Sequence, residues 1–142
     1  MKYDTEYTYS KLELAKAQLE KAIELFLEES NYACSITLAG ASEEILGKLL
    51  IEEGKEPELK EYATQCAEDS KNIVDTELQE KDFATEANYF RNHCKHYMDG
   101  NPITISGWAA SGILNRAITN YFSLTGEETE LMKQFNWKVN GV

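Results

Sequence analysis

Positive charge is scarce in this chain of 142 residues. Lysine and arginine together number 14 against 25 aspartates and glutamates, and the formal net charge is −11. Affinity for nucleic acid comes largely from the release of counterions by clustered lysines and arginines. The charge deficit therefore excludes an extended nucleic-acid-binding face, and any contact with RNA has to be local.

Other familiar signatures are missing as well. The cysteines Cys34, Cys66 and Cys94 form no C-x-x-C pair, so we expect reduced packing residues rather than disulfides. No apolar run is long enough for a membrane span and the N-terminus is polar, which predicts a cytoplasmic protein without membrane contact. Walker, G-x-G-x-x-G, H-E-x-x-H and E-x-x-H patterns are absent, so no cofactor and no metal are expected.

Helical periodicity dominates what is present. We expect an all-α fold, one domain over residues 1–142, large enough to bury its own core. The expected architecture is an up-and-down bundle of four to five helices with a short extra C-terminal helix. The expected helices cover about 10–29, 31–53, a less regular stretch from Leu59 to Leu78, 82–100 and 106–123, with the short helix from Thr125.

Local signals predict where these helices begin and end. Ser10 is the expected cap of the first helix, and Gly54 is expected to end the second. Pro57 opens the third helix, and the short turn makes it an antiparallel neighbour of the second. Thr125-Gly126-Glu127-Glu128 matches a capping box for the last helix, and Trp108 is expected in the core.

Small residues recur on the second expected helix, where Ala33, Gly40 and Gly47 are spaced at seven-residue intervals. Such a stripe lets a second backbone approach closely. It is compatible with a seam inside the bundle or with a dimer contact. We favour the internal seam because it is the commoner use of such a stripe.

The residues best suited to chemistry gather in one segment, Arg91-Asn92-His93-Cys94-Lys95-His96, which holds one of the two arginines and both histidines of the chain. Arginine offers a fixed charged fork, asparagine an orienting donor, and histidine a group that moves a proton near neutral pH. Together they suit the handling of a phosphodiester.

A continuous helix over 82–100 would order this segment into two faces. Asn88, Asn92, His96 and Asp99 would share a polar face flanked by Arg91 and Lys95, and Phe90, Cys94 and Tyr97 would share an apolar one. Arg91 and His96 would diverge by about 140°. They would meet a common ligand only across the polar face or between two subunits. His93, near the apolar edge, is expected to pack rather than to catalyse.

The pattern Arg91-Asn92-x-x-x-His96, late in a helical bundle of this length, resembles the nuclease members of the HEPN family. The resemblance implies a metal-independent, toxin- or defence-related endoribonuclease. It would act as a homodimer with two Arg–His motifs facing each other, RNA as substrate and an antitoxin-like protein as partner. The chain departs from the toxin branch, in which a tyrosine commonly lies two residues beyond the histidine, because Met98 stands there.

The resemblance also implies a role for each motif residue. His96 would move the proton of a ribose 2′-hydroxyl, Arg91 would neutralise the phosphate, and Asn92 would orient either group. Lys95 and Asn88, on the same expected face, are the candidate substrate-binding residues.

A second interpretation belongs to a different functional class. A non-catalytic HEPN-like helical module for dimerisation or protein–protein interaction would suit the negative charge, with the polar face as a hydrogen-bonded interface. Both interpretations predict a dimer. Metal-independent cleavage of RNA is the property that separates them.

Overall fold

The computed structural model describes residues 2–73 and 80–142, and every regular element in these residues is helical, as predicted. The elements are α1 (Lys11–Glu29), α2 (Tyr32–Glu52), α3 (Glu58–Ile73), α4 (Glu80–Ala87), α5 (Tyr89–Lys95), α6 (Gly107–Thr125), α7 (Glu130–Phe135) and a π-helical turn, η1 (Asn136–Asn140). None of the helices in the described ranges has both the length and the apolar character that crossing a membrane requires.

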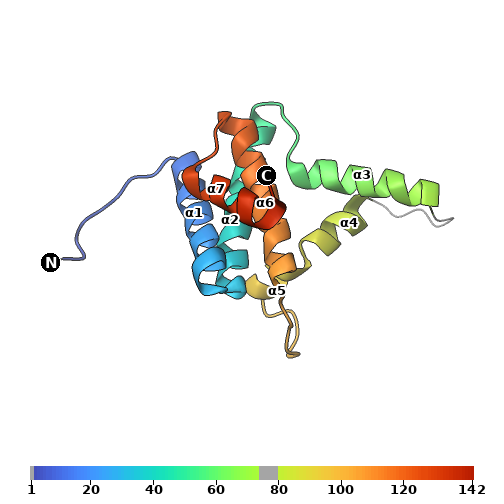
Figure 1. Ribbon diagram of the computed structural model, residues 1–142, viewed down its shortest axis with the longest axis horizontal. Helices are drawn as coiled ribbons and strands as arrows, with labels where there is room; N and C mark the ends of the chain where they lie inside the picture. Colours follow the sequence, from blue (N-terminus) through green and yellow to red (C-terminus); the bar gives the residue numbers. More distant parts are fainter. Residues whose placement is uncertain (1, 74–79) are drawn as a thin grey trace.

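Three long helices, α1, α2 and α6, pack side by side, and α7 lies against α1 (Figure 1). Helix α5 lies at one end of this group against α2, whereas α3 and α4 pair with each other and project to one side. The segment before α1 extends away from the body on the other side (Figure 1). The core lies between α1, α2, α6 and α7 and includes the fully buried Leu19, Ile23, Ile36, Leu46, Leu114 and Phe135.

The predicted boundaries of the first, second and fifth expected helices are confirmed to within about two residues, the usual uncertainty of a helix end. Ser10 and Glu13 form a reciprocal capping box at the start of α1, with the Glu13 N–H donating to Ser10 Oγ at 3.0 Å. Ser106 accepts from the N–H of Ala109 at the start of α6. These caps satisfy backbone donors that a helix start leaves unpaired.

Two buried serines join α1 to α2. The hydroxyl of Ser35 donates to the carbonyl of Ala22 at 2.8 Å, and the hydroxyl of Ser42 donates to the carbonyl of Ala15 at 2.7 Å. Both serines are fully buried. Their hydroxyls therefore serve as contacts between neighbouring helices.

The continuous helix expected over 82–100 is wrong. Helix α4 ends at Ala87, Asn88 has φ −94° and ψ 2°, and α5 ends at Lys95. Tyr97 is 89% exposed and does not join an apolar face. The two-face arrangement predicted for this segment therefore fails at both ends.

The expected pairing of the second and third helices is also wrong. Gly54 ends α2 as predicted, with φ 75°, but α3 packs against α4 and α6. The ammonium of Lys55 donates to the carbonyl of Ser123 at 3.0 Å, and Asn120 Oδ1 accepts from the N–H of Glu58 at 2.9 Å. These two bonds attach the connection to α6 and direct α3 away from α2. The end of the expected third helix, around Leu78, lies outside the described residues.

Further corrections concern α6 and the C-terminal helix. Trp108 is 79% exposed and is not a core residue. Thr125 is the last residue of α6 rather than a cap, and Thr129 caps α7 instead. Of the small-residue stripe, Gly40 faces Arg91 and Gly47 faces Pro57, so both lie at seams within the chain, whereas Ala33 is exposed.

Candidate functional site

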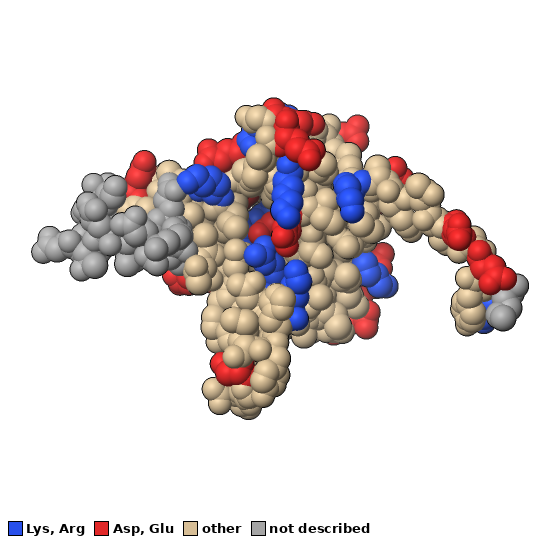
Figure 2. Space-filling model, turned by 180° about the vertical axis from the view of Figure 1, so that it is seen from behind, with Lys and Arg blue, Asp and Glu red and all other residues tan. Residues whose placement is uncertain are grey.

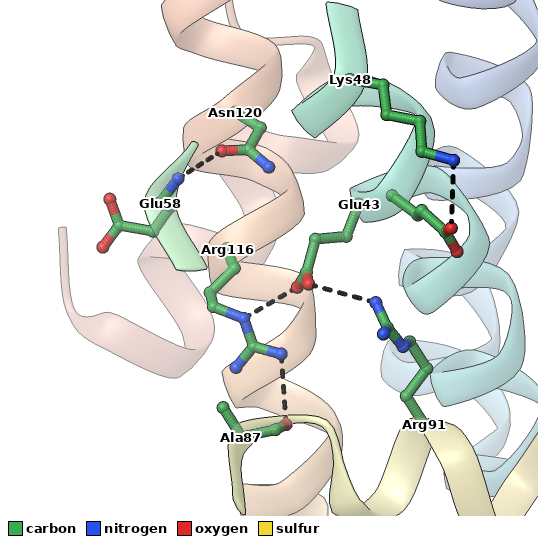
Figure 3. A network of polar contacts seen from close by, with 8 residues as sticks. Glu43, Lys48, Glu58, Ala87, Arg91, Arg116 and Asn120 are labelled. Carbon is green, nitrogen blue, oxygen red and sulfur yellow. Dashed lines mark hydrogen bonds and ion pairs between the residues drawn. The ribbon is translucent and has the colours of Figure 1, made fainter. Parts of the chain in front are cut away.

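A buried carboxylate on α2 contacts both arginines of the chain. Glu43 is 3% exposed, and its Oε2 accepts a hydrogen bond from Arg116 Nε at 2.8 Å. Its Oε1 lies 3.7 Å from Arg91 Nη1. Figure 3 shows the two guanidiniums approaching from opposite sides, one from α6 and one from α5.

The cluster contains two positively charged guanidiniums and one carboxyl group. Burial raises the pKa of the Glu43 carboxyl above its ordinary value, although Arg116 and then Arg91 act in the opposite direction. Both guanidiniums are permanently charged. When Glu43 is ionised, the cluster therefore carries an uncompensated positive charge, and the longer contact leaves it mainly on Arg91.

Arg91 is held against α2 but not saturated with partners. A Cβ on Gly40 would lie 2.5 Å from Arg91 Cγ and 2.7 Å from Cδ, so the absence of a side chain there makes room for the arginine stem. The Arg91 side chain is 19% exposed. Apart from the ion pair with Glu43, its guanidinium donates no hydrogen bond within the part of the chain that the structure describes.

Arg91 and Lys95 line a small pocket of about 100 Å³ between α2 and α5. The rest of its lining is Thr37, Gly40, Ala41 and Glu44. Glu44 is paired with Lys48 at 3.4 Å on the same helix. On the face shown in Figure 2, several lysine and arginine side chains lie close to acidic side chains near the middle of the molecule. A small anion in this pocket would meet two cations, Arg91 and Lys95, and one carboxylate, that of Glu44, which Lys48 pairs.

His96 lies just beyond α5. Its backbone is extended, with φ −125° and ψ 148°, and its N–H donates to the carbonyl of Asn92 at 2.8 Å. The residue is exposed. His96 therefore leaves the helical face on which sequence reasoning had placed it, and the predicted angle between Arg91 and His96 does not apply.

The other predicted residues divide between the pocket and the fold. Lys95 lines the same pocket as Arg91. Asn92 is half-buried and contacts His96 through its backbone carbonyl. Asn88 stands at the break between α4 and α5, and its buried side-chain oxygen has no hydrogen-bond partner in the described residues. Asn88 does not share an exposed polar face with Asn92 and His96.

Three neighbours of the motif have structural contacts. The ring of His93 packs on Tyr89, with centroids 4.3 Å apart, as expected of a packing histidine. Cys94 is half-buried against the core, also as expected. The carboxylate of Asp99 accepts from the N–H of Asn101 at 2.8 Å and so shapes the loop after α5.

Sequence reasoning missed Glu43 and Arg116, although each left a signal. Glu43 follows Ile36 by seven residues and precedes Leu50 by seven, which places its charge on the buried stripe of α2. Arg116 stands between the buried Ile113 and Asn120 on α6. A charged residue on an apolar stripe is almost always paired, and the chain offers few cations to pair it with.

Among the side chains that the structure describes, those of residues 2–69 and 84–142, no three histidines, cysteines, aspartates or glutamates are grouped as a metal site requires. No protein-family model, curated protein or solved structure matches the chain. The site is therefore interpreted from its own chemistry.

Proposed function

We propose that the chain is a metal-independent endoribonuclease of the HEPN type, acting as a homodimer through Arg91 and His96. The observation that carries the proposal is the state of Arg91. Its guanidinium lies at a small pocket beside Lys95, with one ion pair of 3.7 Å and further donors available. The planar fork of an arginine matches phosphate as well as carboxylate oxygens, and a phosphate group is thus a ligand that these donors fit.

The position of His96 supports the requirement for two subunits. Because α5 ends at Lys95, His96 is displayed on the exposed chain beyond the helix, while Arg91 is held back against Glu43. In a homodimer, His96 of one protomer and Arg91 of its partner would approach the same phosphodiester. The site would then be complete only between two copies of the chain.

The proposed reaction balances without a metal. The imidazole of His96 takes the proton from the ribose 2′-hydroxyl, the 2′-oxygen forms a bond to phosphorus, and the bond from phosphorus to the 5′-oxygen breaks. The leaving 5′-oxygen receives a proton from an imidazolium at the dimeric site, and Arg91 neutralises the charge that grows on the phosphate. The products are a 2′,3′-cyclic phosphate and a 5′-hydroxyl.

The test is cleavage of a mixed RNA pool in EDTA, with analysis of the product ends. The proteins compared are the wild type, Arg91→Ala and His96→Ala, with His93→Ala as the matched control because His93 is the only other histidine. Arg91→Ala leaves Glu43 paired with Arg116, so folding should survive. We expect cyclic-phosphate ends from the wild type and His93→Ala and at least a hundredfold loss, roughly the contribution of an acid–base group, in His96→Ala. Full activity of His96→Ala would refute the proposal.

A second candidate function is favoured by a different observation. Tyr97, Met98 and Trp108 are 89%, 56% and 79% exposed, and they lie on the loop after α5 and the first turn of α6. Aromatic residues and methionine are enriched in protein interfaces relative to the rest of a protein surface. A dimerisation or interaction module without catalysis would use them. The wild type would then cleave no RNA in EDTA. The Trp108→Ser protein would nevertheless show a lower mass than the wild type by sedimentation, because its dimer would be lost.

A further inference from the structure

Arg116 lies outside the Arg91–His96 segment, and its contacts reach two other helices. Its side chain is 11% exposed. Its Nε donates to Glu43 Oε2 at 2.8 Å, and its Nη2 donates to the backbone carbonyl of Ala87 at 3.3 Å (Figure 3). A single planar guanidinium therefore ties α6 to α2 and to the last residue of α4.

The bond to Ala87 falls at the break between α4 and α5. The last carbonyls of a helix lack partners within that helix and need other donors. Arg116 supplies one of these donors, and the next residue, Asn88, starts α5 without a side-chain cap. Arg91 lies on the first turn of α5. The direction in which α5 presents Arg91 is thus fixed in part by Arg116.

Arg116 also limits how strongly Glu43 holds Arg91. The carboxylate makes its short, charge-assisted bond to Arg116 and only a 3.7 Å contact with Arg91. Without Arg116, Arg91 would be the remaining arginine in the chain and, among the described side chains, the one cation paired with this buried carboxylate. An unpaired buried charge is strongly disfavoured. Glu43 would then draw the Arg91 guanidinium inward, away from the pocket.

We propose that Arg116 is a positioning residue for phosphodiester binding. Through Glu43 and the carbonyl of Ala87 it keeps Arg91 at the pocket with its donors available, and it does not touch the ligand itself. This inference rests on the proposed function for the class of ligand. It does not depend on cleavage, because a phosphodiester that lacks a 2′-hydroxyl is sufficient to test it.

The scarcity of arginine makes a direct measurement practical. Because the chain has only Arg91 and Arg116, isotope-labelled arginine gives two Nε–Hε signals in an NMR spectrum. Arg91→Lys and Arg116→Lys each remove one signal and so assign them. The Arg91 signal can then be followed in Arg116 variants and during titration with the deoxydinucleotide thymidylyl-thymidine.

We expect Arg116→Met to shift the Arg91 signal and to weaken dinucleotide binding about tenfold, the effect of losing one charge-assisted hydrogen bond. Arg116→Lys keeps the charge but cannot direct two bonds from one plane, so its effect should be intermediate. Lys16→Met, on the exposed side of α1, removes the same charge away from the network and should change neither readout. Circular dichroism checks that each variant folds. If Arg116→Met does not fold, the Arg91 signal and the dinucleotide affinity of Arg116→Lys test the inference.

Two results would overturn the inference. The first is that the Arg91 signal and the dinucleotide affinity are both unchanged in the folded Arg116 variants, and the second is that the wild type does not bind the dinucleotide. A different pattern separates this inference from the nuclease proposal. If the wild type binds the dinucleotide, the Arg116 variants bind it less well, and RNA is never cleaved, the positioning role stands and the nuclease proposal fails.

Discussion

Gly40→Ala should have two opposing effects, a gain in the helix propensity of α2 and a clash with the side chain of Arg91. Within a helix, replacing glycine by alanine stabilises by about 1 kcal/mol through backbone propensity alone. At position 40, however, the new Cβ would lie 2.5 Å and 2.7 Å from two carbons of the Arg91 stem. Overpacking of this kind costs about 1–3 kcal/mol. We therefore expect a net effect between neutral and about 2 kcal/mol destabilising, with Arg91 displaced from Glu43.

Gly112 offers a matched control. It also lies within a long helix, α6, but a Cβ there meets nothing within 4 Å. Gly112→Ala should therefore show the full gain of about 1 kcal/mol. Urea denaturation of both variants measures the difference, which we expect to be about 1–3 kcal/mol in the unfolding free energy.

A double-mutant cycle makes this prediction sharper. Arg91→Ala removes the two clashing carbons and leaves only Cβ, which is 3.6 Å from the new methyl group, an ordinary contact. In that background Gly40→Ala should stabilise by about 1 kcal/mol, as at Gly112, so the coupling energy should be about 1–3 kcal/mol. Coupling near zero, or a single Gly40→Ala variant as stable as Gly112→Ala with unchanged dinucleotide binding, would refute the reasoning.

Three further predictions concern the core, the buried carboxylate and the exposed surface. Ser42→Ala removes the bond to the Ala15 carbonyl and should lower the unfolding free energy by about 1 kcal/mol in urea; no change would contradict a stabilising role. Burial raises the pKa of Glu43 above 4.5, so the folded state holds its proton to higher pH than the unfolded state. The free energy that this tighter proton binding adds to folding is fully present below the ordinary pKa of a glutamate, and it is lost as pH rises through the raised pKa of Glu43. Over the pH range between the ordinary and the raised pKa, the unfolding free energy of Glu43→Gln should therefore fall less than that of the wild type. An equal fall in both proteins would contradict the raised pKa of Glu43. Trp108→Ser should leave the thermal midpoint within about 2 °C, because the side chain is 79% exposed; a larger drop would indicate that Trp108 is covered, within the fold or in a dimer.

Much of the secondary structure was predictable from the sequence because its causes are local. Ser10 with Glu13 makes a capping box, Gly54 adopts the positive φ that ends α2, and the apolar stripes of α1, α2 and α6 repeat at helical spacing. Each of these signals acts within a few residues along the chain. The all-helical class follows from them.

The segment around the candidate site could not be predicted in this way. Periodicity extended the helix over 82–100, yet α4 ends where Arg116, 29 residues further along, donates to the carbonyl of Ala87. The sequence predicts that Arg91 and Lys95 flank one polar face, and in the structure both residues line one pocket. The partner of Arg91 is Glu43, which lies 48 positions earlier in the chain. The two side chains meet only because α2, α5 and α6 pack together.

The sequence alone therefore determined α1, α2 and α6, the cap at Ser10 and a set of residues capable of phosphate chemistry, because propensity, capping and periodicity act between near neighbours. Only the tertiary structure decided that α3 leaves α2 for α6, that His96 lies beyond the helix and that both arginines share one buried carboxylate. The course of α3 and the shared carboxylate depend on hydrogen bonds and ion pairs between residues distant in the chain. Their formation is favoured only after packing has removed the groups from water, and no local pattern encodes that step.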